Sequence, residues 1–303
     1  MEQKRRSIVL LVMAMLAWGS VYPASKYKMA ETSPLTMSFH RYFIGTLTLT
    51  PFFINEIRKN RNYITKENLF ISAAAGLFGV TLLAILLFTG VSLSTASNGS
   101  IIVNTQPIFL AFLAPLFIKE SVSRLQILGI AAGLAGMVLV VTNGDLSVLS
   151  NNRSMFLGNI LLAGASLSMS IYSLILKKHI IRWGGFMPTY ISMLFGTFFL
   201  FIINLFSSRF FSDIRELTAV SDILLILYLG CVSTAFAYLL FNNSLKYIDV
   251  VKASGFKFLV PVSGVGLSIL FLGERPSIFV YAGVVIVVLS IVLIQRAPKR
   301  VLI

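Results

Sequence analysis

Two basic residues, Arg41 and Lys257, lie inside long apolar segments that contain no acidic residue. A charge in the hydrocarbon core of a membrane costs about 2.5–3.5 kcal/mol on insertion scales, so such residues are candidates for function. All 11 acidic residues lie at segment ends or in loops. This distribution favours a cavity that receives anionic or zwitterionic groups over a proton relay between carboxylates.

Lys257 precedes Pro261 by four residues. In a helix this proline removes the amide that would bond to the Lys257 carbonyl, which leaves an acceptor beside a cationic side chain. A donor and an acceptor on one turn could bind an amino acid or a similar polar substrate. The alternative is that Lys257 extends to the nearer membrane surface, about 10 Å away at 1.5 Å per residue.

Arg41 has two interpretations as well. It could contact substrate, or its planar guanidinium could hold carbonyls at a helix end near the outer face. The structural interpretation is favoured.

Aromatic residues recur at helical spacing in two of the apolar segments. Trp18 and Tyr22 share one helix face, and Pro23 frees the carbonyl of Gly19. In a later segment Tyr238 and Asn242 have the same spacing. These side chains could line a cavity, although aromatic stripes more often serve packing.

Uncharged polar residues complete the candidate set. Asn98 and Asn104 lie within one apolar segment, and Tyr172 aligns with Trp18 when the two halves of the chain are compared. Buried amides need partners, which a neighbouring helix, water or a substrate could supply. For any one amide, contact between helices is the simpler interpretation.

The elements that position these residues are long apolar segments. The chain has 303 residues, of which 57% are hydrophobic and 12% charged, and its mean hydropathy is +0.88. Spanning a bilayer takes about 20 apolar residues in a helix. Ten segments qualify, and we expect ten transmembrane helices and no soluble domain: 8–28, 34–54, 69–89, 97–117, 124–142, 156–176, 187–207, 222–243, 251–271 and 277–295.

The net charge of +14 is explained by orientation in the membrane, not by nucleic-acid binding. With the amino terminus in the cytoplasm, 17 of the 25 basic residues fall on the inner side and six on the outer side. An excess of Lys and Arg in short loops marks the cytoplasmic side. We therefore expect both termini in the cytoplasm, in a multi-pass protein of the bacterial inner membrane.

The chain repeats itself at an interval of 154 residues. Matched pairs include Pro34 with Pro188, Gly76 with Gly230, Pro107 with Pro261, Glu120 with Glu274 and Gly129 with Gly283. The predicted units, 1–150 and 151–303, have five helices each, so the second enters the membrane from the opposite side. Inverted repeats are typical of secondary transporters, although a duplication can also be retained for packing.

The residues also resemble a known family. The resemblance rests on Trp18-Gly19 with Tyr22-Pro23, His40-Arg41-Tyr42-Phe43, Asn104-Thr105-Gln106-Pro107-Ile108-Phe109, Lys119-Glu120 before Gly129, and Phe258-Leu259-Val260-Pro261-Val262 followed by Leu272-Gly273-Glu274-Arg275. This pattern is similar to that of the EamA-type drug/metabolite transporter superfamily over essentially the whole chain. The resemblance implies a ten-helix bundle of two inverted repeats around a central cavity, and export of small metabolites, amino acids or drugs.

The sequence thus predicts a secondary transporter that works by alternating access on small amphipathic metabolites such as amino acids. The expected binding residues are Trp18, Tyr22, Arg41, Asn98, Asn104, Tyr172, Tyr238, Asn242 and Lys257. The expected gating or structural residues are Pro23, Pro107, Pro261, Glu120 and Glu274, the glutamates at the positive ends of the helices that follow them.

Other functions remain as alternatives. A membrane-embedded enzyme would need an acidic pair or a nucleophile with a base, and none has suitable spacing. A passive channel or a scaffold is compatible with an unpaired cationic cavity. No P-loop and no metal-ligand spacing around Cys231 is present, so we expect no enzymatic activity, cofactor or metal. We expect a small-molecule substrate that carries a carboxylate, and a lipid bilayer, as partners; no oligomeric state follows from the sequence.

Overall fold

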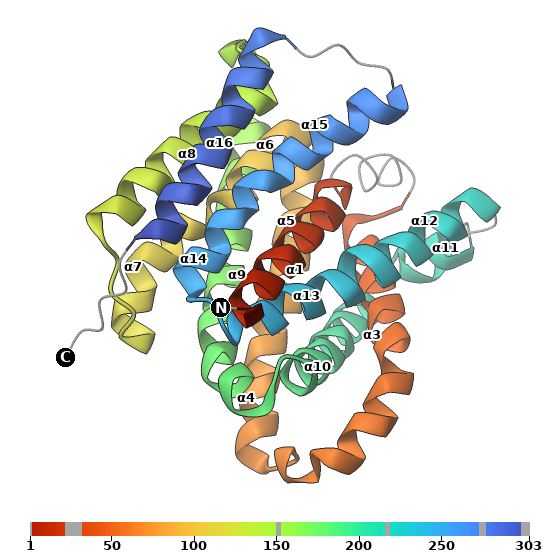
Figure 1. Cartoon of the computed structure of the whole chain (residues 1–303). Coiled ribbons are helices and arrows are strands. Elements are labelled where there is room, and N and C mark those ends of the chain that lie inside the picture. Colours follow the sequence, from red (N-terminus) through yellow and green to blue (C-terminus); the bar gives the residue numbers. More distant parts are fainter. Residues whose placement is uncertain (1, 22–31, 150–152, 216–218, 273–276, 298–303) are drawn as a thin grey trace.

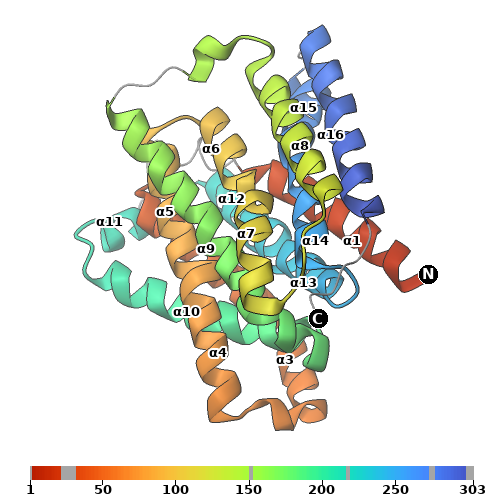
Figure 2. The ribbon, with the colours of Figure 1, turned by 90° about the vertical axis from the view of Figure 1, so that its left-hand side faces the viewer.

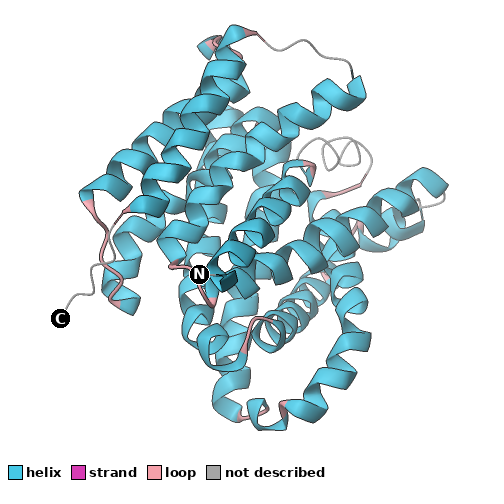
Figure 3. Cartoon of the chain, viewed as in Figure 1, coloured by secondary structure: helices cyan, strands magenta, loops and turns pink. Residues whose placement is uncertain are grey.

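A computed structural model describes residues 2–21, 32–149, 153–215, 219–272 and 277–297. Within these ranges every regular element is a helix, and the connections are short loops (Figure 3). The prediction of an all-helical protein is therefore confirmed. The expected site residues Tyr22 and Pro23 and the expected gating residue Glu274 lie outside the described residues.

The α-helices share an apolar composition and follow one another closely. They are α1 (Glu2–Gly19), α3 (Pro34–Lys59), α4 (Lys66–Gly76), α5 (Leu83–Leu93), α6 (Ala96–Ile102), α7 (Gln106–Ile118), α8 (Arg124–Thr142), α9 (Arg153–Trp183), α10 (Phe186–Leu205), α11 (Phe210–Arg215), α12 (Val220–Gly230), α13 (Ala237–Leu245), α14 (Val250–Gly255), α15 (Leu259–Leu272) and α16 (Ile278–Arg296). Short 3-10 turns occur at Arg61–Tyr63, Val103–Thr105, Leu146–Leu149 and Phe256–Phe258. Two π turns, Leu77–Leu82 and Cys231–Phe236, join α4 to α5 and α12 to α13.

Among the described residues, seven helical stretches are long and apolar enough to cross a membrane. They are Lys66–Leu93, Asn98–Ile118, Arg124–Thr142, Arg153–Trp183, Phe186–Leu205, Val220–Leu245 and Ile278–Arg296. The three other expected spans, 8–28, 34–54 and 251–271, are helical where they are described but are not among these seven stretches. For α3 the reason is polar content, since His40, Arg41 and several threonines interrupt its apolar residues.

Several helices in the two halves of the chain begin and end at the 154-residue interval found in the sequence. The pair α4 and α12, the two π turns, and the pair α8 and α16 each begin and end 154 residues apart. Packing is matched in the same way, because α1 packs on α13 as α9 packs on α5, and α3 packs on α12 as α10 packs on α4. Helices α8 and α16 lie side by side along one edge of the bundle (Figures 1 and 2). Helices from the first half of the chain thus pack directly on helices from the second.

Glycines allow α8 and α16 to approach each other closely. A Cβ built on Gly283 would lie 2.7 Å from the carbonyl oxygen of Gly136, and a Cβ on Gly136 would lie 2.9 Å from the carbonyl oxygen of Gly283. Atoms at these distances must move apart. Small residues at such positions are a common means of close packing between membrane helices.

We expect Gly283→Ala to separate α8 from α16 and to lower the free energy of unfolding by about 1–3 kcal/mol, the usual cost of overpacking. The measurement is thermal unfolding of the purified protein in detergent. Gly266→Ala, in α15, is the matched control, because a Cβ there meets no atom within 4 Å. Equal unfolding temperatures for the two variants would show that the α8–α16 contact is not tight.

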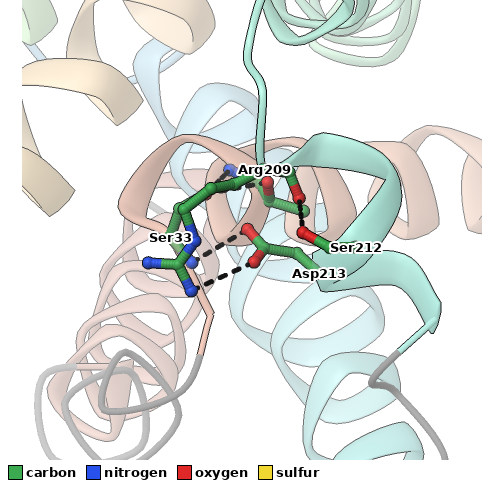
Figure 4. Close-up of polar contacts among 5 residues, drawn as sticks. Ser33, Arg209, Ser212 and Asp213 are labelled. Atoms are coloured by element: carbon green, nitrogen blue, oxygen red, sulfur yellow. Dashed lines mark hydrogen bonds and ion pairs between the residues drawn. The ribbon is translucent and has the colours of Figure 1, made fainter.

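Asp213, in the short helix α11, holds the start of α3 (Figure 4). The backbone N–H of Ser33, the residue before α3, donates to Asp213 Oδ2 at 3.0 Å. Arg209 Nη2 lies 3.3 Å from Asp213 Oδ1, and the Asp213 side chain is buried although that of Arg209 is 59% exposed. A carboxylate here also meets the positive end of the α3 dipole.

These contacts set the pKa of Asp213. Burial raises the pKa of this carboxyl, but hydrogen bonds with Ser33 and Thr36 and the charge of Arg209 outweigh burial and hold the pKa below its ordinary value. The ionised form is therefore favoured in the folded protein. Its contribution to stability is complete above the unfolded-state pKa of about 3.9 and is lost as the pH falls through the lower folded-state pKa.

We expect Asp213→Asn to lower the unfolding temperature at about pH 6, and we expect this difference from the wild type to shrink below about pH 4. Thermal unfolding between these pH values measures it. Arg209→Gln should keep most of the pH dependence, because the hydrogen bonds from the start of α3 remain. A difference that is constant with pH would contradict the assigned role of the carboxylate.

Candidate functional site

A cavity lies where helices from both halves of the chain meet. It is lined by Trp18, Val21, Arg41, Tyr42, Leu83, Leu87, Val103, Asn104, Met169, Tyr238 and Lys257. The cavity contains about 450 Å³ of empty space, including the space at its open side, but the centre of a water molecule reaches only about 50 Å³ of it. One water needs about 10–15 Å³ of the space that its centre can reach, so the cavity has room for a few waters. A metabolite could enter only if the lining side chains moved apart.

Tyr238, on α13, is the centre of the aromatic wall. Its ring lies 5.7 Å from the Trp18 ring, 6.0 Å from that of Tyr42 and 5.9 Å from that of Tyr172, all edge-on. The Tyr238 hydroxyl donates to the Gly79 carbonyl at 2.7 Å and contacts the Tyr42 hydroxyl at 2.8 Å. Gly79 belongs to the first π turn, where the helix departs from its regular hydrogen bonding. Hydrogen bonds to that turn therefore fix the orientation of the wall.

Arg41 makes the corresponding contact with the second π turn. Its Nη2 donates to the Ser233 carbonyl at 3.0 Å and its Nε to Thr234 Oγ1 at 2.6 Å. Trp18 Nε1 donates to the same Ser233 carbonyl at 3.1 Å. The sequence had suggested that Arg41 binds carbonyls at a helix end. It instead binds a π turn inside the helical stretch Val220–Leu245. Arg41 also lines the cavity while it holds this turn.

Lys257 is 4% exposed and lies at the cavity. Its Nζ is 4.8 Å from the centre of the Trp18 ring and 5.8 Å from that of Phe241, distances typical of cation–π contacts. Among the described residues its ammonium has no hydrogen bond or ion pair. The expectation of a free Lys257 carbonyl is wrong, because the 3-10 turn Phe256–Phe258 turns the Leu259 amide back onto it.

The prolines follow the same 3-10 turns. Pro107 lies in the first turn of α7, directly after Val103–Thr105, and Pro261 lies near the start of α15, directly after Phe256–Phe258. A missing amide is tolerated in the first turn of a helix, where it has no partner within the helix. Each proline therefore fits the point where its span changes from a 3-10 turn to an α-helix.

Five of the expected binding residues line the cavity: Trp18, Arg41, Asn104, Tyr238 and Lys257. Three do not. Asn98 donates to Ser94 Oγ at 3.0 Å, and Asn242 donates to Tyr172 and to Thr189 at 2.6 and 2.7 Å. These amide nitrogens and the Tyr172 hydroxyl are thus engaged with other side chains, while Asn242 Oδ1 is buried without a partner among the described residues.

Sequence reasoning missed several lining residues. Tyr42 follows Arg41 directly, and Val103 is the counterpart of Lys257 at the 154-residue interval, so both carried a usable signal. Leu83, Leu87 and Met169 carried none, because they do not differ from the other apolar residues of their helices.

Glu120 makes a hydrogen bond and an ion pair away from the cavity. Its Oε2 accepts the Val250 amide at 3.0 Å, and its Oε1 lies 3.9 Å from Nζ of the buried Lys177. Lys177 also donates to the carbonyls of Leu245 and Ile248. Glu120 therefore meets the start of α14, a contact that its place before α8 in the sequence did not predict. Helix α8 has its own cap, in which Ser123 and Gln126 exchange hydrogen bonds.

We expect Arg41→Gln to lower the free energy of unfolding by about 1.5–3 kcal/mol, because hydrogen bonds from a charged group to the π turn are lost. Arg41→Lys should restore little, since an ammonium cannot donate in the two directions of the guanidinium fork. Arg209→Gln is the control, because an exposed arginine contributes about 0.5 kcal/mol or less. Thermal unfolding that is the same for Arg41→Gln and the wild type would remove Arg41 from this structural role.

Known proteins show similarity over nearly the whole chain. The sequence model of the EamA-like transporter family matches twice, at residues 5–142 and 156–296. An uncharacterized transporter of Archaeoglobus fulgidus is 26% identical over 94% of this chain and 96% of its own length. The uncharacterized transporter YvbV of Bacillus subtilis is 26% identical over 98% and 93%. A protein of known crystal structure superposes with a TM-score of 0.76 over 95% of both chains at 15% identity, which shows the same fold.

These matches are independent of the cavity geometry, and the family model covers each half of the chain separately. The chain belongs to the EamA-like transporter family.

Proposed function

We propose that this membrane transporter is a secondary carrier of small amphipathic metabolites that bear a carboxylate, a class that includes amino acids, and that it moves them outward. The observation that supports this most directly is the cavity itself. Two cations, Arg41 and Lys257, lie beside the aromatic rings of Trp18 and Tyr238. Cations attract the carboxylate and the rings pack on the apolar part of the substrate.

Two inverted repeats would explain the arrangement around the cavity. We propose a bundle of ten helices in two five-helix units, 1–150 and 151–303. The matched bounds of α4 and α12 and of α8 and α16, the π turn in each half, and the matched packing partners support this. In inverted-repeat transporters the substrate site lies near the bilayer midplane between the repeats.

Alternating access requires a contact that opens on one side. The hydrogen bond from Val250 to Glu120, with Lys177 beside it, joins the ends of α7, α9 and α14. We propose that this contact closes one side of the carrier, and that Glu274, at the equivalent position in the second half, serves the opposite side. The two contacts would form in turn as the repeats rock.

The orientation is part of the same proposal. The surplus of basic residues in the loops on one side supports a protein of the bacterial inner membrane with both termini in the cytoplasm. The Glu120 contact then lies on the cytoplasmic side, because its partner Lys177 and the neighbouring Lys178 and Arg182 belong to that basic side.

The alternatives are a passive channel and a membrane-embedded protein without transport activity. A cationic cavity would also suit an anion pore. A carrier saturates and exchanges substrate across the membrane, whereas a pore gives linear flux without exchange. Catalysis forms no part of the proposal.

The test uses purified protein in liposomes loaded with labelled amino acids, nucleosides or organic acids. We expect saturable uptake and counterflow for a carboxylate-bearing compound. Lys257→Ala should lower the flux or raise the apparent Michaelis constant by about tenfold or more, the value of one lost charged contact. Its thermal unfolding should stay close to that of the wild type.

Lys246→Ala is the matched control, because Lys246 is an exposed lysine away from the cavity. It should leave flux unchanged. Linear flux without counterflow would exclude the carrier, and unchanged kinetics in Lys257→Ala would remove Lys257 from the site.

A further inference from the structure

The described residues of the cavity carry positive charge only. Among the described lining residues two are cationic and none is acidic. Ion pairs lie elsewhere in the described chain, such as Lys59 with Glu56, Lys177 with Glu120, and Arg209 with Asp213. Charged groups inside membrane proteins are normally paired. A ligand that enters the cavity could supply the missing negative charge.

Both cations are linked to Trp18, one through a ring contact and the other through a shared hydrogen-bond acceptor. Lys257 Nζ is over the ring of Trp18, and Arg41 Nη2 donates to the carbonyl that also accepts from Trp18 Nε1. Each is 4% exposed. Like charges in a site of low dielectric repel each other far more than in water. An anion between them removes this repulsion, whereas a cationic group adds to it.

Two of the groups that could accept a hydrogen bond from an ammonium already have donors. The Ser233 carbonyl already accepts from Arg41 and Trp18, which uses both lone pairs. The Lys257 carbonyl accepts the Leu259 amide. The hydroxyls of Tyr42 and Tyr238 are hydrogen-bonded to each other. The described lining residues thus offer an α-ammonium group no carboxylate, and the Ser233 carbonyl beside them is already fully used.

We propose that the cavity selects substrates with net negative charge, in which a carboxylate is joined to an apolar or aromatic body without an ammonium group, over the amino acids of the same shape. The carboxylate binds between Lys257 and Arg41, and the body packs among Trp18, Tyr42 and Met169. This inference rests on the proposed transport function and narrows its substrate class.

The test compares four ligands of nearly one shape. They are 3-phenyllactate, an anion; phenylalanine, the zwitterion in which ammonium replaces the hydroxyl; 2-phenylethanol, which is neutral; and phenethylamine, a cation. The chain has two tryptophans, so in a Trp183→Phe background Trp18 alone reports binding by its fluorescence. Titrations are done on the full chain in detergent at neutral pH, with chloride and phosphate titrated separately.

We expect phenyllactate to bind at least about tenfold more tightly than phenylalanine, and phenethylamine not to bind, since one charged contact accounts for about a factor of ten or more. Lys257→Gln should abolish the preference and Lys257→Arg should retain it, both with wild-type unfolding temperatures. Phenylethanol should bind more weakly than phenyllactate.

Tighter binding of phenylalanine, no binding of phenyllactate, or an unchanged preference in Lys257→Gln would overturn the inference. So would chloride or phosphate that binds as tightly as phenyllactate, because the site would then hold a bare anion. Flux assays keep the two proposals apart. Saturable exchange that favours phenylalanine refutes the selectivity and leaves the carrier intact, whereas an anion preference in binding without any flux refutes the carrier alone.

Discussion

One carbonyl oxygen organises the centre of this protein. The Ser233 carbonyl accepts hydrogen bonds from Arg41 on α3 and from Trp18 on α1, and it belongs to the π turn between α12 and α13. In a regular helix it would be used within the same chain segment. Inside a membrane protein little water is available to replace a missing partner, and here the carbonyl in the π turn is satisfied by two other helices. Helices α1 and α3 are thereby joined to the π turn at one point, and the cavity forms beside it.

The contact between Arg41 and the π turn also explains part of the positive charge of the cavity. Arg41 is needed by the π turn, so its charge is present whether or not a ligand is bound. Lys257 rests on the rings of Trp18 and Phe241, which stabilise an ammonium without neutralising it. On the substrate class proposed above, the site would be preorganised for an anion, in part by Arg41, which also holds the fold together. The small space available to water indicates that the helices must separate before a ligand can occupy it.

Much of this arrangement is visible in the sequence, because charges and aromatic rings stand out in apolar helices. Arg41, Lys257 and Trp18 could be predicted for that reason. The π turns could not, since no residue type marks them, and the partner of Arg41 depends on them. Polarity alone does not place Asn98 and Asn242 relative to the cavity, because the same amide can line a cavity or bind a neighbouring side chain. The partner of Glu120 could not be predicted from its position, because the helix whose first amide it binds starts 130 residues further along the chain.

The two π turns also carry information about ancestry. They occupy equivalent positions, Leu77–Leu82 and Cys231–Phe236, so on the two-repeat organisation the irregularity was present in the single-copy ancestor and was inherited twice. The charges have a different history. The counterparts of Arg41 and Lys257 are Phe195 and Val103, both apolar. On that organisation, the backbone irregularity would predate the duplication, and the chemical asymmetry of the cavity would have developed afterwards as the two halves diverged.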